Sequence, residues 1–226
     1  MSTALLELAC DCLGELADEV VFVGGAAVGL WISDPGAPTP RVTNDVDVII
    51  VATYAEYDGF AQRLRARGLR SDATVICRHR HASGLILDVM PTDSAVLGFT
   101  NRWYREAVGA AGTVALPSGR MIRAVRPPWL VATKLEAFAG RGRDDPITSA
   151  DFEDLVRLVD GRPELAGEIA AAPVELRKDV AAAFDRFAAR ADFREIVEAA
   201  LPLEAGSSGR VEVVAGRWRA IAGRSG

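Results

Sequence analysis

The spacing of hydrophobic residues changes near residue 126 of the chain. Before it, short apolar runs typical of strands alternate with helical patterns, and after it apolar residues recur almost throughout at helical spacing. The predicted strands are 20–23, 45–52, 74–77, 85–90, 113–116 and 121–125. The predicted helices are 3–18, 26–32, 54–67, 127–140, 149–160, 162–171, 173–190 and 192–201. The pattern predicts an α+β protein, in which a core with a small mixed β-sheet flanked by helices (1–126) precedes a helical C-terminal region (127–204).

Two segments fit neither pattern. Residues 34–40 contain three prolines and a glycine, which exclude a helix or a central strand and predict a loop. Residues 205–209 are rich in glycine and serine, so we expect 205–226 to form a flexible linker and tail.

The composition is that of a globular protein. The chain has 226 residues, of which 50% are hydrophobic and 25% charged, so it can bury a real core, and disordered or fibrous architectures are excluded. No apolar run approaches the roughly 20 residues that cross a bilayer, and the first 20 residues are acidic without a basic region. We therefore expect a cytoplasmic protein with no membrane partner.

The charge is unevenly distributed. The net charge of −5 argues against broad nucleic-acid coating, which needs many cationic contacts with phosphates. Residues 63–81 nevertheless contain six arginines and one aspartate. This stretch is either a solvated helix face with its loop or an RNA-binding surface.

Two acids interrupt a buried strand. Asp45 and Asp47 are two residues apart, so their carboxylates project from the same face of the strand. Because neighbouring anions among apolar residues repel and lose hydration, we expect a cation between them. Mg²⁺ (or Mn²⁺) suits one or two carboxylates together with phosphate oxygens.

Gly24 and Gly25 follow a strand and lead into a helix. Such a turn lets backbone amides approach a phosphate, and its spacing fits neither a dinucleotide fingerprint nor a P-loop. A plain strand-to-helix turn is the alternative. Asp88 lies in another apolar strand, where it either completes a three-carboxylate site for a second metal or serves as an ion-pair partner.

These residues resemble the signature of the nucleotidyltransferase superfamily related to DNA polymerase beta. That signature is a strand, Gly-Gly, a helix, Asp-x-Asp and a third acid on a later strand, here Gly24, Gly25, Asp45, Asp47 and Asp88. The resemblance covers roughly residues 20–160. It implies metal-dependent transfer of a nucleoside monophosphate from a nucleoside triphosphate to an acceptor hydroxyl, with these five residues as metal and phosphate ligands.

Within that superfamily the chain looks most like the AbiEii-type toxins of type IV toxin–antitoxin systems. Such proteins carry a helix lysine, basic residues and an Asp-x-x-Asp helix, here residues 134–143 and 151–155. The resemblance implies that Lys134 contacts phosphate and that Asp151 helps to bind the nucleotide. The alternatives are a solvated Lys134 and an Asp151 that caps its helix or pairs with Arg157.

The same resemblance places Thr43 at the rim of the site, where a surface loop is the alternative. The chain departs from the family in two ways: 19 residues separate Gly25 from Asp45, and Ala150 stands where many relatives have arginine. The first departure is absorbed by the proline-rich loop, because insertions in loops cost little.

The implied function is a toxin that modifies a tRNA 3′ end and has an antitoxin partner. One alternative is a nucleotidyltransferase for small molecules, such as an aminoglycoside. Another is a catalytically silent nucleotide-binding regulatory module, against which the three retained carboxylates argue.

Overall fold

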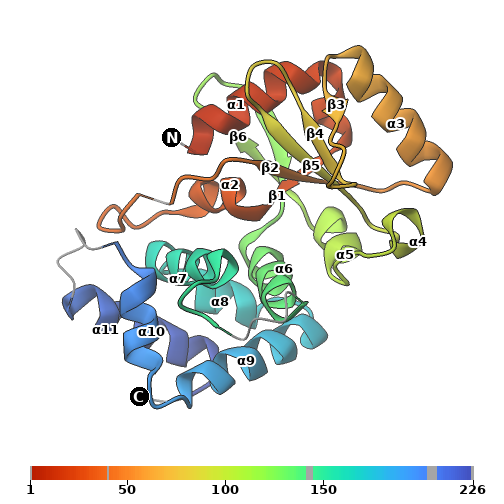
Figure 1. Ribbon diagram of the computed structural model, residues 1–226. Helices are drawn as coiled ribbons and strands as arrows, with labels where there is room; N and C mark the ends of the chain where they lie inside the picture. The colour runs from red at the N-terminus through yellow and green to blue at the C-terminus, as the bar shows by residue number, and fades with distance from the viewer. Residues whose placement is uncertain (1, 40, 141–144, 203–207, 225–226) are drawn as a thin grey trace. The chain divides into compact units, whose positions relative to one another are not determined.

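The computed structural model describes residues 2–39, 41–140, 145–202 and 208–224, which belong to two compact units (Figure 1). Unit 1 comprises Met1–Leu30 and Arg41–Arg126, and unit 2 comprises Trp31–Pro40 and Pro127–Gly226. The third crossing between the units, after Arg126, falls where the hydrophobic period changes. The proline-rich segment belongs to unit 2, although the strands on either side of it belong to unit 1.

Unit 1 is built on a mixed sheet, which has seven strands in the described part of the chain. The strands are β1 (Val21–Val23), β2 (Val46–Ile50), β3 (Arg70–Ser71), β4 (Arg78–Arg80), β5 (Ile86–Pro91), β6 (Gly112–Ala115) and β7 (Met121–Ala124). Their order is β3-β4-β5-β2-β1-β7-β6. β2 lies at the centre, parallel to β5 and antiparallel to β1, and both of its faces are largely buried.

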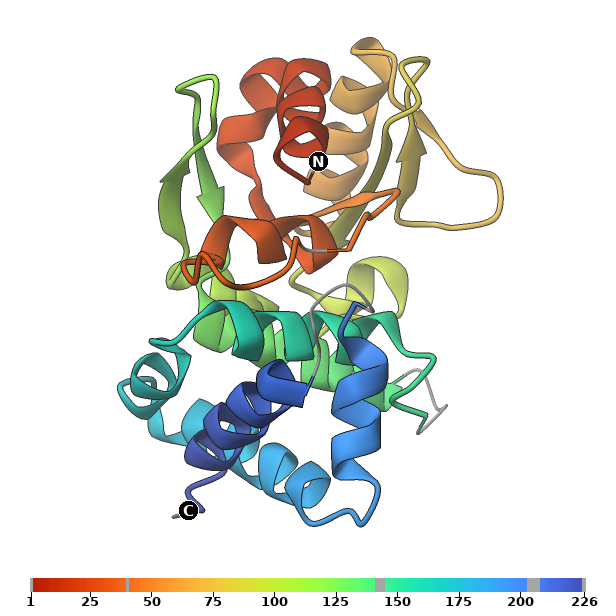
Figure 2. The same cartoon turned by 90° about the vertical axis from the view of Figure 1, so that its left-hand side faces the viewer.

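Helices flank this sheet. They are α1 (Ser2–Leu13), η1 (Gly14–Glu19), α2 (Gly24–Val28), α3 (Tyr54–Ala66), α4 (Ser94–Leu97) and α5 (Tyr104–Gly109), and η2 (Gly29–Trp31) leads out of the unit. α1 and α3 lie side by side (Figures 1 and 2), where Arg67 Nε donates to the Cys12 carbonyl at 2.7 Å. α3 begins with a capping box formed by Thr53 and Glu56, which satisfies backbone N–H groups of its first turn.

The strand predicted at 74–77 is wrong, because the chain turns there and β4 begins at Arg78. Asp72 Oδ1 accepts hydrogen bonds from the backbone N–H groups of Thr74 and Val75, at 2.8 and 3.1 Å. This local turn competes successfully with the β-propensity of the sequence that follows Asp72. The shift matters for the site, because it brings Arg78 into the sheet.

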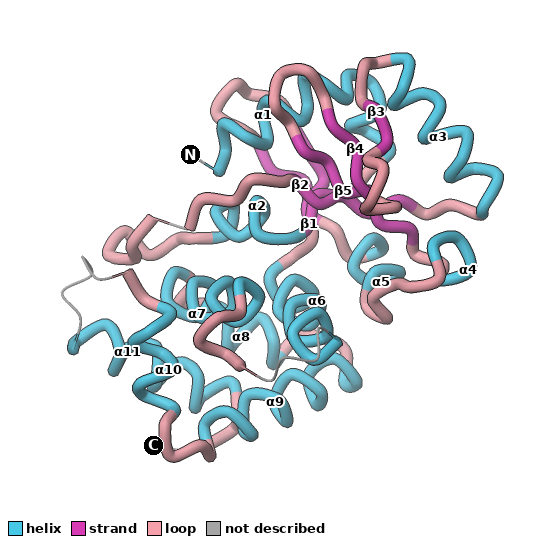
Figure 3. Tube along the Cα trace, in the orientation of Figure 1, coloured by secondary structure: helices cyan, strands magenta, loops and turns pink. Residues whose placement is uncertain are grey.

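The described part of unit 2 consists of helices joined by loops, with no strand (Figure 3). Its helices are α6 (Pro127–Gly140), α7 (Ala150–Gly161), α8 (Leu165–Ala170), α9 (Val174–Ala188), α10 (Phe193–Ala200) and α11 (Ser208–Ile221). Ser149 caps α7 by accepting from Phe152 N at 3.2 Å. No helix in the described ranges is both long and apolar enough to cross a membrane.

Helix α11 differs from the linker and tail predicted for 205–226. Its Trp218 is fully buried, stacks on Phe184 with ring centroids 4.1 Å apart, and donates its Nε1–H to the Phe184 carbonyl at 3.0 Å. Phe152, Phe187 and Phe193 surround it. This aromatic cluster holds α11 in the unit, while residues 205–207 of the predicted linker lie outside the described residues.

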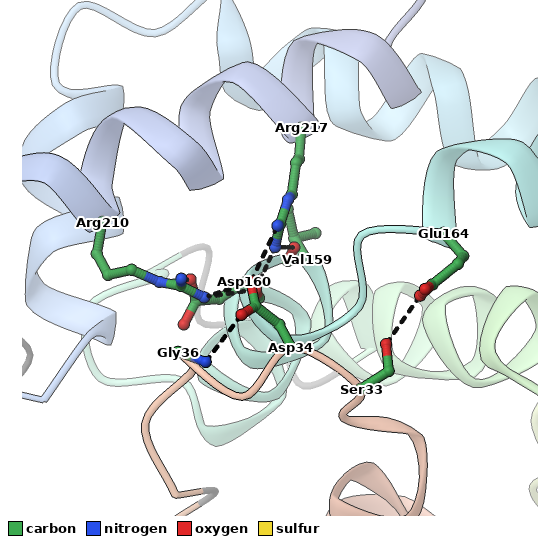
Figure 4. A network of polar contacts seen from close by, with 8 residues as sticks. All are labelled: Ser33, Asp34, Gly36, Val159, Asp160, Glu164, Arg210 and Arg217. Carbon is green, nitrogen blue, oxygen red and sulfur yellow. Dashed lines mark hydrogen bonds and ion pairs between the residues drawn. The ribbon is translucent and has the colours of Figure 1, made fainter.

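The proline-rich segment is fixed to unit 2 by a network of charges (Figure 4). Asp34 accepts from Arg210 and Arg217 of α11, at 3.2 and 3.0 Å. Arg210 also donates to the Asp160 carboxylate at 2.6 Å, and both arginines donate to the Asp160 carbonyl. Two arginines therefore connect the segment, the end of α7 and α11.

We expect Trp218→Ala to lower the free energy of unfolding by about 3–5 kcal/mol, because it removes the centre of the aromatic cluster. Trp218→Phe keeps a stacked ring and loses the hydrogen bond, so it should cost about 1 kcal/mol from that bond plus a smaller packing loss. Urea denaturation followed by circular dichroism measures both. Val213→Ala, at a half-exposed position of the same helix, is the control. Equal midpoints for Trp218→Ala and Val213→Ala would contradict a structural role of α11.

Candidate functional site

The two acids of the Asp-x-Asp pair lie at the start of β2 in unit 1. Asp47 is opposite Val23 of β1 on one side and Asp88 of β5 on the other. Arg78 of β4 is in turn opposite Asp88. Residues paired across a sheet share a face, so Asp47, Asp88 and Arg78 form one row of side chains across three strands. Asp45 lies two residues before Asp47 and on the same face.

Arg78 binds two of the three predicted carboxylates. Its Nε and Nη2 each lie 2.8 Å from one oxygen of Asp88, which is a bidentate pair. The same Nη2 lies 3.0 Å from Asp45 Oδ2. The cation that we expected beside the acids is thus supplied, in part, by a side chain of the protein.

This ion pair lies in a partly buried place. The side chain of Asp88 is 11% exposed and that of Arg78 23%, whereas Asp45 is more open at 37%. Hydrogen bonding to Asp88 raises the pKa of Arg78 above its ordinary value, so the guanidinium stays charged. Burial, followed by the charge of Asp88, raises the pKa of the neighbouring Cys77 thiol to about 11.

Asp45, Asp47 and Asp88 were predicted to share metal ions, and the structure gives Asp88 a different neighbour. Within the described residues, no group of three or more Asp, Glu, His or Cys side chains is arranged to hold a metal ion. Asp88 faces Arg78 with both of its oxygens. Asp45 and Asp47 remain as a pair of carboxylates on one face of the strand.

Gly24 lies directly against this pair. It has a φ of +73°, which favours glycine, and it begins α2 together with Gly25, so the predicted strand-to-helix turn is present. A Cβ atom on Gly24 would come within 1.9 Å of Asp47 Oδ2. The glycine is therefore required by the position of the Asp47 carboxylate.

Thr43 precedes the acids and is 9% exposed, so it does not lie on an open loop surface. Its hydroxyl oxygen has no hydrogen-bond partner among the described residues. A buried hydroxyl without a partner costs free energy, and such a group is commonly satisfied by water, an ion or a ligand.

Lys134 and Asp151 come together in unit 2. Lys134 Nζ lies 3.0 Å from Asp151 Oδ1 and 2.6 Å from Asp154 Oδ2, and the three side chains are 9%, 4% and 1% exposed. Lys134 is thus a buried, ion-paired cation and not a solvated one. Arg157 pairs with Glu153. The basic residues Arg141 and Arg143 of the same motif lie outside the described residues.

The arginine-rich stretch 63–81 is largely engaged within the protein. Its contacts are those of Arg63 with Glu19, Arg67 with the Cys12 carbonyl, Arg78 with Asp88 and Asp45, and Arg80 with Asp72. Three of its six arginines, Arg63, Arg78 and Arg80, are thus paired with carboxylates, which weakens the interpretation of this stretch as an RNA-binding surface.

Sequence reasoning missed Arg78 as a member of the site. Arg78 belongs to the stretch interpreted as a solvated helix face with its loop or an RNA-binding surface, because the strand was expected to end at Cys77. The signal was present: Arg78 and Arg80 alternate with histidines, as strand residues do, and Asp88 is an isolated acid that needs a partner.

Comparison with solved structures identifies a protein of similar fold. The crystal structure of an antigenic nucleotidyltransferase-like protein from Paracoccidioides brasiliensis aligns with a TM-score of 0.52 and 19% identity, covering 90% of this chain and 95% of that one. No protein-family model matches the chain, and no curated protein matches it. The shared fold agrees with the predicted nucleotidyltransferase-like core, while the likeness to AbiEii-type toxins stays a prediction.

Proposed function

We propose that the protein is a metal-dependent nucleotidyltransferase, which moves a nucleoside monophosphate from a nucleoside triphosphate to an acceptor hydroxyl. The observation that carries the proposal is the pair Asp45 and Asp47 on one face of the central strand, next to the Gly24 turn. The similarity of the fold to a nucleotidyltransferase-like protein supports it.

The residues suit a divalent cation. Asp45 and Asp47 offer hard carboxylate oxygens side by side, and Mg²⁺ or Mn²⁺ prefers such ligands when it also binds phosphate. Bound there, the ion would neutralise charge on the triphosphate and orient it. Thr43 supports a ligand at this end of β2, because its buried hydroxyl lacks a partner among the described residues.

In the proposed reaction the acceptor hydroxyl oxygen attacks the α-phosphorus. The new O–P bond forms as the bond from the α-phosphorus to the bridging oxygen breaks, pyrophosphate leaves with the electron pair, and the hydroxyl proton is lost to solvent. This chemistry depends mainly on positioning and charge neutralisation. Gly24 and Gly25 would let backbone amides approach the phosphates, while Asp45 and Asp47 orient the triphosphate.

We propose that Lys134 contacts a phosphate of the nucleotide and that Asp151 holds Lys134 in position. Two carboxylates fix Lys134 Nζ, so the ammonium group is positioned and is not free to explore solvent. A lysine binds a phosphate oxygen as a point charge, and this is the contact that the family resemblance implies for Lys134.

We propose two classes of acceptor. A tRNA 3′ end is the first acceptor to test, because the resemblance to AbiEii-type toxins suggests it, together with a toxic role and an antitoxin partner. A small-molecule acceptor is the second candidate, favoured by the internal pairing of the arginine-rich stretch. Induced expression in cells tests the toxic role: growth arrest with the wild type, and normal growth with Asp45→Asn, are expected.

We expect Asp45→Asn and Asp47→Asn each to lower transfer by about 100-fold or more, because each loses a charge that holds the cation on the triphosphate. The assay incubates the protein with Mg²⁺, each labelled nucleoside triphosphate in turn, and either total RNA or small-molecule hydroxyl acceptors. EDTA should abolish the label in the product. Asp58→Asn, an exposed acid of α3, is the matched control and should retain activity.

Label in tRNA-sized RNA supports the tRNA acceptor, and label in a small molecule supports the second candidate. Mg²⁺-dependent binding of the triphosphate without transfer to any acceptor would indicate a catalytically silent nucleotide-binding module instead of an enzyme. Equal transfer by wild type and both variants would contradict the proposed site.

We expect Lys134→Met to lower the free energy of unfolding by about 3–5 kcal/mol, because it leaves Asp151 and Asp154 buried without their cation. The double variant Lys134→Met/Asp154→Asn should recover part of that loss. Thermal and urea unfolding measure stability, and the transfer assay separates the two roles. If Lys134 contacts phosphate, the double variant stays inactive at temperatures where it is folded. Restored transfer in the double variant would assign Lys134 a structural role alone.

A further inference from the structure

The contacts of Arg78 bear on how many cations the carboxylate site holds. We propose that Arg78 is a built-in cation of this site, which takes the place of a second metal ion at Asp88 and leaves Asp45 and Asp47 to bind one divalent cation. The inference rests on the proposed function and deepens it. It assigns Arg78 as a positioning residue and Asp88 as its anchor.

The geometry of the Arg78–Asp88 pair supports this assignment. Both oxygens of Asp88 receive guanidinium N–H groups at 2.8 Å, so each already accepts a charged hydrogen bond. Bidentate Arg–carboxylate pairs are the stronger class of charged hydrogen bond. A metal ion at Asp88 would have to compete with this pair.

Backbone pairing also fixes the position of Arg78 in the sheet. β4 and β5 are paired so that Arg78 lies opposite Asp88. Backbone hydrogen bonds hold both sides of Arg78: its carbonyl accepts from Asp72 N, and the carbonyl of Cys77 accepts from Val89 N, each at 2.8 Å. Arg78 is therefore a fixed strand residue, in contrast to a long side chain on an open surface.

The Arg78 guanidinium also contacts Asp45. The Nη2 group that binds Asp88 also lies 3.0 Å from Asp45 Oδ2. Arg78 thereby orients one member of the Asp-x-Asp pair and leaves its other oxygen for a cation. A pair that served only to neutralise Asp88 would not need this contact.

The positive charge of Arg78 also disfavours a second metal ion at the site. Arg78 already brings one positive charge to Asp45 and Asp88. A second divalent cation would add two positive charges close to a guanidinium that cannot lose its proton. Unit charges a few ångströms apart in a partly buried site repel by several kcal/mol, so the second ion is disfavoured.

The test counts bound Mn²⁺ by electron paramagnetic resonance, with Mn²⁺ alone and with a non-hydrolysable nucleoside triphosphate analogue. We expect one protein-bound Mn²⁺ per chain for the wild type in both conditions, and still one for Asp88→Asn. Asp45→Asn/Asp47→Asn should bind none at the protein. Arg78→Gln frees Asp88 and should either bind a second Mn²⁺ or bind the first about tenfold more tightly.

Arg80→Gln is the matched control, because Arg80 lies two residues along the same strand and its ion pair with Asp72 is separate from the acids. It should bind Mn²⁺ as the wild type does. Arg78→Gln leaves Asp88 without a partner and can fail to fold. In that case the wild type and Asp88→Asn decide, because Asp88→Asn keeps a side chain of the same shape beside Arg78.

Two bound Mn²⁺ in the wild type, of which Asp88→Asn loses one, would overturn the inference. An Arg78→Gln protein that is folded and has unchanged Mn²⁺ number and affinity would also overturn it. The transfer assay on the same preparations separates the two proposals. A wild type that transfers the nucleotide and binds two Mn²⁺ leaves the proposed function standing without the inference, whereas one that neither transfers nor binds Mn²⁺ removes both.

Discussion

The ion pair between Arg78 and Asp88 is the interaction on which the candidate site depends. The central strand of the sheet carries two acids, and the strand beside it carries a third in register with them. Three carboxylates in such a place repel one another and lose hydration. Arg78 reduces this repulsion, because its planar guanidinium binds two of the three carboxylates at once and keeps its charge. The same contact fixes the orientation of Asp45.

Unit 2 also contains buried carboxylates, and other cationic side chains compensate their charge. Lys134 lies between Asp151 and Asp154, while two arginines of α11 hold Asp34 and Asp160. Burying such charges is costly, and removing one partner leaves the other uncompensated. The hydrophobic cluster around Trp218 places α11, and its arginines then attach the proline-rich segment to the unit. Apolar packing and buried ion pairs are thus coupled in this region.

Residues with a strong local pattern could be predicted from the sequence. The Asp-x-Asp strand, the Gly24 turn and the five helices from 127 to 201 follow from period and turn chemistry, and the structure has them. Helix α11 could not be predicted in this way, and strand β4 is indicated only by the alternation of Arg78 and Arg80 with histidines. The side-chain turn at Asp72 displaced the expected strand, and α11 depends on burial of Trp218 by residues distant in sequence. The Arg78–Asp88 pair depends on register, which the sequence does not reveal.

A sequence motif of three acids therefore leaves the number of bound cations undetermined. The same carboxylates can face two metal ions, or one metal ion and an arginine, and the choice depends on what the adjacent strand places opposite the third acid. Here the opposite residue is Arg78. A guanidinium carries one positive charge in a fixed geometry and needs no binding equilibrium, so it organises Asp45 and Asp88 before any ligand arrives. On the proposed assignment, Asp88 gives up its capacity to bind a metal. On this reasoning the acids of the site differ in role according to their neighbours, although they look equivalent along the chain.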